Sequence, residues 1–353
     1  MSKIIKNQEK PVQKYRLFIQ ILFSLLCIWI GVEFYFFVKY ISSPNDSAFI
    51  SRPPGVDGFL PISSFMSLIY FLKTGNISMI HPAGLIIFSA IIIISFIVGK
   101  SFCSWLCPIG FISEAINDLS IKLFRRKFRM PKVADYILRS LKYFLLAFFL
   151  YSIVFLMTDL SLKMFLDSPY NQTADIKMYY FFADISLFAF CVIAILFILS
   201  FFFRNFWCRY LCPYGALLGI ISFLNPLKIR RNTDTCTDCK LCTKVCPSNI
   251  KVHKLKTVYS DECTSCLTCV DACPVKDTLQ MKLTPKGKRL NKKYVPIIVA
   301  GLFMLITGFG IVSGYWQNKI TKETYIELHK HINDFGHPTD KNSIEKFNES
   351  SAE

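Results

Sequence analysis

Five stretches of the chain are apolar over about 20 residues each, and this feature limits its fold more than any other. They lie at 17–40, 82–100, 138–157, 180–203 and 295–315. A helix of that length crosses the roughly 30 Å of hydrocarbon in a bilayer, whereas strands of an outer-membrane barrel would alternate in polarity. The composition agrees, because 53% of the 353 residues are hydrophobic and only 18% are charged. We therefore expect an α-helical integral membrane bundle with about five transmembrane helices, which excludes a soluble enzyme and a disulfide-stapled secreted module.

Lysine and arginine are unevenly distributed among the segments that join these stretches. The arm before the first stretch holds 5, the 41–81 loop 2, the 100–139 loop 8, the 158–179 loop 2 and the 204–293 segment 17. Cytoplasmic segments of membrane proteins carry the excess of basic residues. The counts predict a cytoplasmic N-terminus, a cytoplasmic 204–293 segment and a tail outside. Anionic lipid at the membrane surface then accounts for the net charge of +17, and no nucleic-acid partner is expected.

Two cysteine runs carry the most specific pattern in the sequence. CTDCKLCTKVCP (236–247) and CTSCLTCVDACP (263–274) both read CxxCxxCxxxCP, with an offset of 27 residues. This run is typical of bacterial ferredoxins with two 4Fe-4S clusters, in which the fourth cysteine of each run ligates the other cluster. A zinc site is the alternative, but zinc favours paired CxxC knuckles. The expected ligands are Cys236, Cys239, Cys242 and Cys273 for the first cluster, and Cys263, Cys266, Cys269 and Cys246 for the second.

A second repeat lies at the cytoplasmic ends of two predicted spans. GKSFCSWLCPIGFIS (99–113) and RNFWCRYLCPYGALLG (204–219) contain CxxxCP elements at 103–108 and 208–213, so Cys103 and Cys107 precede Cys208 and Cys212 by 105 residues. Each proline suits the first turn of a helix, so Cys107 and Cys212 are expected at helix N-caps, where the helix dipole lowers a thiol pKa. The four cysteines are candidate redox residues. They could hold a third cluster, a dithiol relay or a transient soft metal, or be small residues packed at helix starts.

These patterns divide the chain into five expected regions. They are a cytoplasmic arm (1–16), a four-helix membrane region (17–229), an inserted small α+β ferredoxin-like domain with two 4Fe-4S clusters (230–285), a linker with the fifth span (286–315) and a periplasmic tail (316–353). A shorter apolar piece at 59–72 is expected to be an interfacial or re-entrant helix, and the tail to form one amphipathic turn around 321–333.

Together, the CxxxCP elements and the ferredoxin runs resemble the membrane-bound polyferredoxins of the NapH, NosR and CcoG type over about residues 82–285. FCSWLCP and WCRYLCPYGALLG are most similar to the NapH-like quinol dehydrogenase component. The resemblance implies an oxidoreductase component of the bacterial inner membrane. It would pass electrons between the quinone pool or a cytosolic donor and a redox partner, such as a cytochrome, a periplasmic reductase or a ferredoxin. The chain departs from NosR-like proteins in lacking a flavin-binding domain before the first span, from NapH-like proteins in its fifth span, and from CcoG-like proteins in its short tail.

Two further interpretations stay open at this point. One is a copper or thiol reductase that assists assembly of a respiratory oxidase or reductase, and the other is an iron–sulfur sensor without turnover. No haem is expected, because only His81 among the five histidines touches a predicted span and no CxxCH motif is present. Glu33 and Asp184 lie inside predicted spans, where ionisable residues serve either structure or proton and quinone chemistry.

Overall fold

The computed structural model describes residues 5–9, 11–44, 49–284 and 287–336. The chain divides into two compact units, each assembled from segments that are far apart in the sequence. Unit 1 consists of residues 1–25, 91–146 and 193–303, and unit 2 of residues 26–90, 147–192 and 304–353. Both units are mostly helical, and unit 1 also contains a small sheet.

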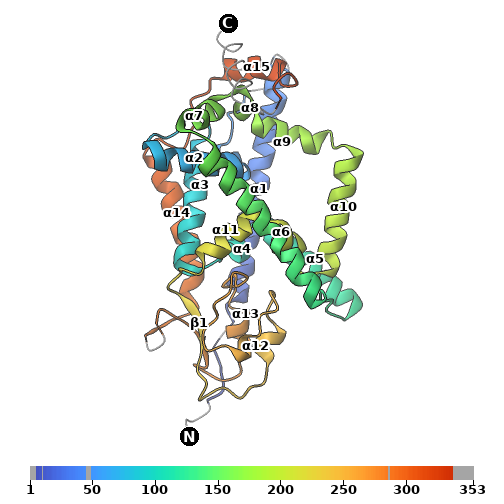
Figure 1. Cartoon of the computed structure of the whole chain (residues 1–353), viewed down its shortest axis with the longest axis vertical. Helices are drawn as coiled ribbons and strands as arrows, with labels where there is room; N and C mark the ends of the chain where they lie inside the picture. The colour runs from blue at the N-terminus through green and yellow to red at the C-terminus, as the bar shows by residue number, and fades with distance from the viewer. Residues whose placement is uncertain (1–4, 10, 45–48, 285–286, 337–353) are drawn as a thin grey trace. The chain divides into compact units, whose positions relative to one another are not determined.

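Three helices in the described part of the chain are long and apolar enough to cross a membrane (Figure 1). They are α1 (Gln13–Ser42), the stretch Lys132–Leu156 formed by α6 (Lys132–Leu150) and the π-helical η2 (Tyr151–Leu156), and α14 (Tyr294–Val312). They correspond to the predicted spans 17–40, 138–157 and 295–315. The chain is therefore a membrane protein with several apolar helices.

The other two predicted spans differ from the expected continuous helices. The second is α3 (Pro82–Val98), which ends where Gly99 adopts the left-handed conformation with φ +76°. Its 17 residues extend about 26 Å, less than the roughly 30 Å of the hydrocarbon core.

The fourth predicted span is broken into α9 (Ala174–Ala183) and α10 (Leu187–Phe202), which meet at an angle of 82°. Asp184 closes α9, and the Ser186 hydroxyl accepts the N–H of Ala189 (3.2 Å) at the start of α10. The described residues thus give three candidate spans, or four if the bent pair is one span, in place of five.

The sheet of unit 1 has three antiparallel strands in the order β1 (Lys228–Arg231), β2 (Leu279–Lys282) and β3 (Arg289–Leu290). Ile229 faces Met281 across the first pair, and both are buried. Further helices of unit 1 carry the cysteine motifs or follow them in the chain. They are α4 (Phe102–Trp105), α5 (Pro108–Phe124), η3 (Trp207–Leu211), α11 (Pro213–Ile221), α12 (Leu241–Lys244), η4 (Val252–Lys254) and α13 (Thr268–Asp271).

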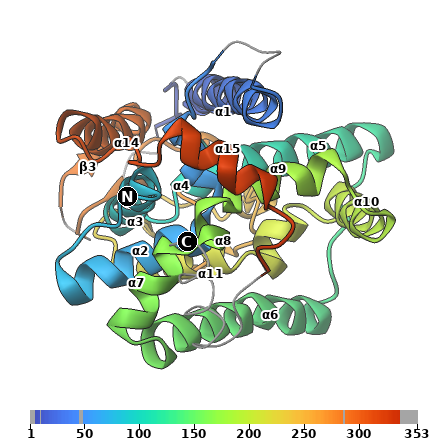
Figure 2. The same ribbon diagram turned by 90° about the horizontal axis from the view of Figure 1, so that it is seen from above.

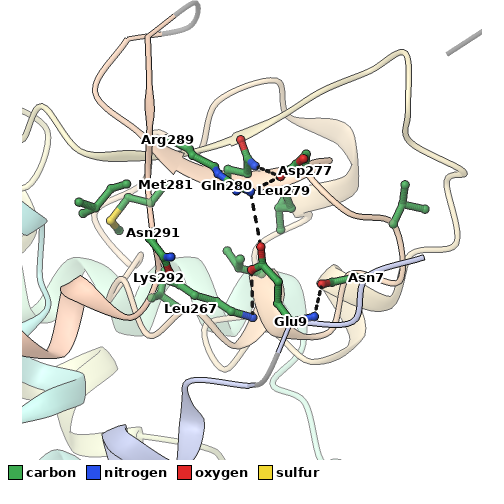
Figure 3. Close-up of a pocket in the computed structure, with 13 residues that line it drawn as sticks. Asn7, Glu9, Leu267, Asp277, Leu279, Gln280, Met281, Arg289, Asn291 and Lys292 are labelled. Atoms are coloured by element: carbon green, nitrogen blue, oxygen red, sulfur yellow. Dashed lines mark hydrogen bonds and ion pairs between the residues drawn. The ribbon is translucent and has the colours of Figure 1, made fainter. Parts of the chain in front are cut away.

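The N-terminal segment packs on the sheet domain within unit 1. The N–H of Lys276 donates to the carbonyl of Ile5 (2.8 Å), and the N–H of Asn7 to that of Pro274 (2.7 Å). Figure 3 shows the next link, where Glu9 lies between Arg289 (3.5 Å) and Lys292 (3.7 Å). The described part of the arm is therefore packed against the sheet region of unit 1.

Unit 2 contains η1 (Pro54–Phe59), α2 (Pro61–Thr74), α7 (Asp159–Asp167), α8 (Pro169–Gln172) and α15 (Lys322–Lys330). Figure 2 shows α2 beside α7, where the two helices share a buried apolar cluster that includes Met66, Tyr70 and Leu162. The short helices predicted at 59–72 and 321–333 are α2 and α15.

A charged cluster is buried in unit 2. Arg52 donates from Nε to Asp175 (2.5 Å) and from Nη2 to Asp57, and all three side chains are at most 4% exposed. His81 links Asp57 (Nδ1 to Oδ1, 2.9 Å) to the carbonyl of Asn171 (Nε2 to O, 2.7 Å). Because that carbonyl can only accept, Nε2 of His81 carries a proton.

Candidate metal centres

The two loops that carry the cysteine runs share one backbone conformation. Asp238 and Ser265 have φ of +48° and +50°, and Lys240 and Leu267 have φ of +60° and +62°. Members of each pair are 27 residues apart. Left-handed residues that alternate with right-handed ones turn successive N–H groups into one concavity, which is a common binding element for iron–sulfur clusters. The repeat in the sequence is therefore also a repeat of backbone geometry.

The cysteines of these loops line two separate cavities of unit 1. One cavity is lined by Cys236, Cys239 and Cys242 together with Cys273. The other is lined by Cys263, Cys266 and Cys269 together with Cys246. Each cavity draws three cysteines from one run and the fourth from the other.

Burial disfavours the charged thiolate form of these cysteines unless a cation is bound. It raises the pKa of Cys263 to about 12 and that of Cys246 to about 11. Metal binding deprotonates such thiols, because the positive charge offsets the cost of desolvating the thiolate. Four sulfur donors and a concave set of N–H groups fit a 4Fe-4S cluster, whose ligands are four cysteine thiolates. Among the described residues, no three Cys, His, Asp or Glu side chains are placed to hold one metal ion.

The CxxxCP elements place their cysteines at helix starts, as the sequence predicts. Cys107 is the N-cap of α5 and Cys212 the N-cap of α11, each followed by proline. The N–H of Gly215 donates to Sγ of Cys212 (3.3 Å).

The expectation that these N-cap thiols have lowered pKa values is wrong for Cys107. The N–H groups of Gly110 and Ile109 do lower the pKa of Cys107, but burial outweighs them and raises it to about 11. Burial likewise raises the pKa of Cys103 to about 12. Low dielectric around a thiol disfavours its charged form more than one helix start favours it.

Several residues around these cysteines were not anticipated from the sequence. Lys100 is 3% exposed. Lys142 is fully buried, and its ammonium donates a hydrogen bond to the carboxylate of Glu262. Asn7 Nδ2 donates to the carbonyl of Cys273 (2.9 Å), and Gln13 Nε2 to that of Cys266 (3.1 Å). These contacts join positions more than 100 residues apart, for which the sequence offers no local signal.

Two ionisable residues were singled out in the predicted spans, and Glu33 lies within α1 whereas Asp184 is the C-cap residue of α9. Glu33 accepts a hydrogen bond from Nε1 of Trp29 on its own helix (3.0 Å), and the N–H of Asp184 caps α9. His81 lies in the buried cluster of unit 2, where it contacts Asp57 and the carbonyl of Asn171.

Comparison with known proteins assigns both cysteine regions to iron–sulfur domains. A "4Fe-4S binding domain" model matches residues 80–131 and 185–232, and a "4Fe-4S dicluster domain" model matches residues 228–284. No solved structure matches the chain significantly.

Three relatives show how widely this arrangement occurs. The Escherichia coli K12 protein named "Putative electron transport protein YccM" is 40% identical over 332 residues, which cover 93% of each chain. The "Regulatory protein NosR" of Pseudomonas aeruginosa is 30% identical over 41% of this chain and 20% of its own. The "Methylamine utilization ferredoxin-type protein MauN" of Methylorubrum extorquens is 25% identical over 54% of this chain and 61% of its own.

The apolar helices and the two matched domains define a membrane protein with 4Fe-4S binding domains. The chain belongs to the polyferredoxin family that includes YccM of E. coli, with NosR and MauN as more distant relatives. Its class is that of a membrane electron transport protein.

Proposed function

We propose that this protein is an electron carrier of the bacterial inner membrane that binds two 4Fe-4S clusters. It would link the quinone pool, or a cytosolic donor, to a respiratory or periplasmic redox partner, in the manner of a NapH-like quinol dehydrogenase component. The observation that carries the proposal is the grouping of eight cysteines into two cavities with four sulfurs each. Bound there, each cluster would supply a one-electron carrier.

The N-terminal segment supports this assignment by fixing one cysteine of each set. Asn7 holds the main chain at Cys273, which lines the first cavity, and Gln13 holds it at Cys266, which lines the second. Gln13 is also the first residue of α1. Rigid ligand loops keep the reorganisation on reduction small, and that suits an electron carrier.

The proposal places the ferredoxin-like domain in the cytoplasm and the tail outside the membrane. It assumes that α3 and the bent pair α9–α10 each cross the bilayer, which together with the three long helices makes five crossings. The distribution of lysine and arginine supports this orientation.

The proposal is tested with the purified protein in liposomes under anaerobic conditions. Addition of menaquinol or ubiquinol should bleach the visible absorbance of the clusters, and a Cys236→Ala/Cys263→Ala variant should show little absorbance to bleach. Clusters that dithionite reduces, but that neither a quinol nor a reduced ferredoxin reduces, would instead indicate a sensor or scaffold.

The same preparation distinguishes a copper or thiol reductase from an electron carrier. The observation that favours a reductase is one cavity of unit 1 that is lined by Cys103 and Cys208, one cysteine from each CxxxCP element. Reduction of added Cu(II) that depends on Cys103 and Cys208, with quinol oxidation unchanged in their absence, would support a role in assembly. Loss of both activities together would support electron carriage.

A further inference from the structure

The two cysteine runs share their backbone conformation but differ in their exposure to solvent. In the first run, Cys239 and Lys240 are exposed, and Leu241 is 39% exposed. In the second run, the residues that correspond to the first two, Cys266 and Leu267, are buried. Because Cys239 lines the first cavity and Cys266 the second, the first cavity has a cysteine at the protein surface.

Two other segments of unit 1 cover the second run. Trp105 of α4 donates from Nε1 to the carbonyl of Ser265 (3.2 Å). At the start of α1, Gln13 donates from Nε2 to the carbonyl of Cys266 (3.1 Å). A soluble partner has to come close to a cluster to exchange an electron with it. Of the two cavities, the first is therefore the one that such a partner can approach.

The exposed run also belongs to a basic stretch of the chain. Residues 236–256 contain five lysines and one acidic residue, Asp238. The stretch that lies 27 positions further on, 263–283, contains two lysines and two aspartates. The repeat thus preserves the cysteines and the backbone but not the charge. All five lysines of the first stretch are exposed, and they are Lys240, Lys244, Lys251, Lys254 and Lys256.

Hydrogen bonds hold the basic segments of unit 1 together. A hydrogen bond of 2.8 Å joins Thr243 Oγ1 to His253 Nδ1 and so fixes η4 beside α12. Lys127 donates from Nζ to the carbonyl of Lys244 in α12 (3.2 Å). It belongs to the stretch 122–132, which joins α5 to α6 and contains no acidic residue. The exposed basic residues of that stretch are Lys122, Arg125, Arg126, Lys127, Arg129 and Lys132.

The exposed basic residues of 122–132 and 240–256 form what we call the basic surface. Anionic lipid accounts for basic residues that flank a span, as those of 122–132 do. It does not account for the five lysines of 240–256, which lie in the stretch matched to the dicluster domain and begin next to Cys239. An exposed leucine among charged residues, as at Leu241, is typical of a protein interface with an apolar centre and a polar rim.

We propose that the basic surface docks a soluble, acidic ferredoxin, which exchanges electrons with the first cluster beside Cys239. This inference rests on the proposed function and names the kind of partner that serves its cytosolic side. A positive surface attracts an acidic partner and excludes a basic one, and it speeds their encounter. In the step to be measured, the reduced ferredoxin loses one electron and the first cluster gains one, while no bond forms or breaks and no proton moves.

Docking is tested by surface plasmon resonance with the whole protein in nanodiscs of neutral lipid. The probe is an oxidised, strongly acidic 2Fe-2S ferredoxin. Wild type should bind it, and association should slow as salt rises, because salt screens the attraction. In Lys244→Glu/Lys251→Glu, association at low salt should slow by about tenfold or more. The matched control is Lys288→Glu/Lys293→Glu, the same charge change at two exposed lysines outside the basic surface, and it should stay within about twofold of wild type.

Stopped-flow reduction gives a second readout with the same proteins. Reduced ferredoxin should reduce the clusters of wild type faster than those of Lys244→Glu/Lys251→Glu, whereas a quinol should reduce both at the same rate. Quinol-reducible clusters in a wild-type protein that binds no ferredoxin would overturn the docking surface and leave the proposed function intact. Clusters that neither a quinol nor a reduced ferredoxin reduces would overturn the proposed function itself.

Three other results would overturn the docking surface. The first is equal association of ferredoxin with wild type and Lys244→Glu/Lys251→Glu. The second is equally fast binding of cytochrome c, a basic carrier, because the sign of the charge would then not select the partner. The third is a lipid role, in which neither protein binds ferredoxin and wild type binds phosphatidylglycerol vesicles more tightly than the variant does.

Discussion

Ser104 donates a hydrogen bond of 2.7 Å to the main-chain carbonyl of Thr264, so that the residues following Cys103 and Cys263 are joined directly across 160 positions of sequence. Gln20 completes this contact by donating from Nε2 to the carbonyl of Ser104 (3.0 Å). One turn of helix α4 is thereby fixed between the start of α1 and the second cysteine run. The arrangement of the cysteine cavities depends on such contacts, which are distant in sequence.

Removing the Ser104 hydroxyl tests this contact. Ser104→Ala leaves the Thr264 carbonyl without its donor and should cost about 1–3 kcal/mol of stability. The measurement is the rate at which cluster absorbance is lost at a fixed elevated temperature, which should rise. Ser101→Ala is the control, since Ser101 is equally buried but its hydroxyl has no hydrogen-bond partner among the described residues. Equal rates in the two variants would show that the contact does not stabilise the cluster region.

The spacing of the cysteines was sufficient to anticipate which four would share a cavity, because the rule for two-cluster ferredoxins is local and leaves little freedom to the loops. The left-handed conformation of Asp238 and Ser265, by contrast, could not be predicted, because neither residue is a glycine. The sequence around Lys100 likewise has no local signal that its side chain is buried.

Single residues in the sequence mark the break in the fourth span and the end of α3. A hydropathy average over about 20 residues hides them. Asp184 and Ser186 favour helix ends, and Gly99 favours a left-handed C-terminus. Each is a single residue inside a long apolar stretch. The packing of the N-terminal segment has no local signal either, because Asn7 meets Cys273 only after the whole chain has folded.

Replacing one carboxylate of the buried cluster in unit 2 should lower the stability of the protein strongly. Asp175→Asn leaves Arg52 buried with a single carboxylate partner, and breaking a buried pair in this way costs about 3–5 kcal/mol. Asp159→Asn is the matched control, because Asp159 is 59% exposed and lies 3.7 Å from Lys73, so it should cost less than about 1 kcal/mol. The folded fraction after heating in detergent, measured by size exclusion, should separate the two. Similar losses would mean that the Arg52 pairs are not needed for the stability of unit 2.

His81 predicts a dependence of stability on pH. Burial alone would lower the pKa of His81, but the charge and hydrogen bond of Asp57 outweigh it, so that the pKa lies above its usual value of about 6.5. The stabilisation is therefore complete below about pH 6.5 and is lost as pH rises through the raised pKa. Thermal stability should fall as pH rises above about 6.5 in wild type, and fall less in His81→Gln. The same loss in both proteins would assign the pH dependence to other groups.

The orientation is tested with reporters fused at two sites. Alkaline phosphatase, which requires export, should be active after Glu353 and inactive after Gly287, and a fluorescent protein that folds only in the cytosol should show the opposite. Export-dependent activity at Gly287 alone would place the ferredoxin-like domain outside and would contradict its proposed position in the cytoplasm.

The crossing of the two cysteine runs is the central structural claim, and paired substitutions with EPR of the reduced protein test it most directly. If Cys246 belongs with Cys263, Cys266 and Cys269, then Cys246→Ala/Cys263→Ala damages one ferredoxin cluster, whereas Cys246→Ala/Cys236→Ala damages both. We predict that the first variant loses about four iron atoms and the second about eight, each measured against wild type. If each run instead encloses its own cluster, the first variant loses about eight and the second about four, and that result would contradict the grouping of cysteines on which the account rests.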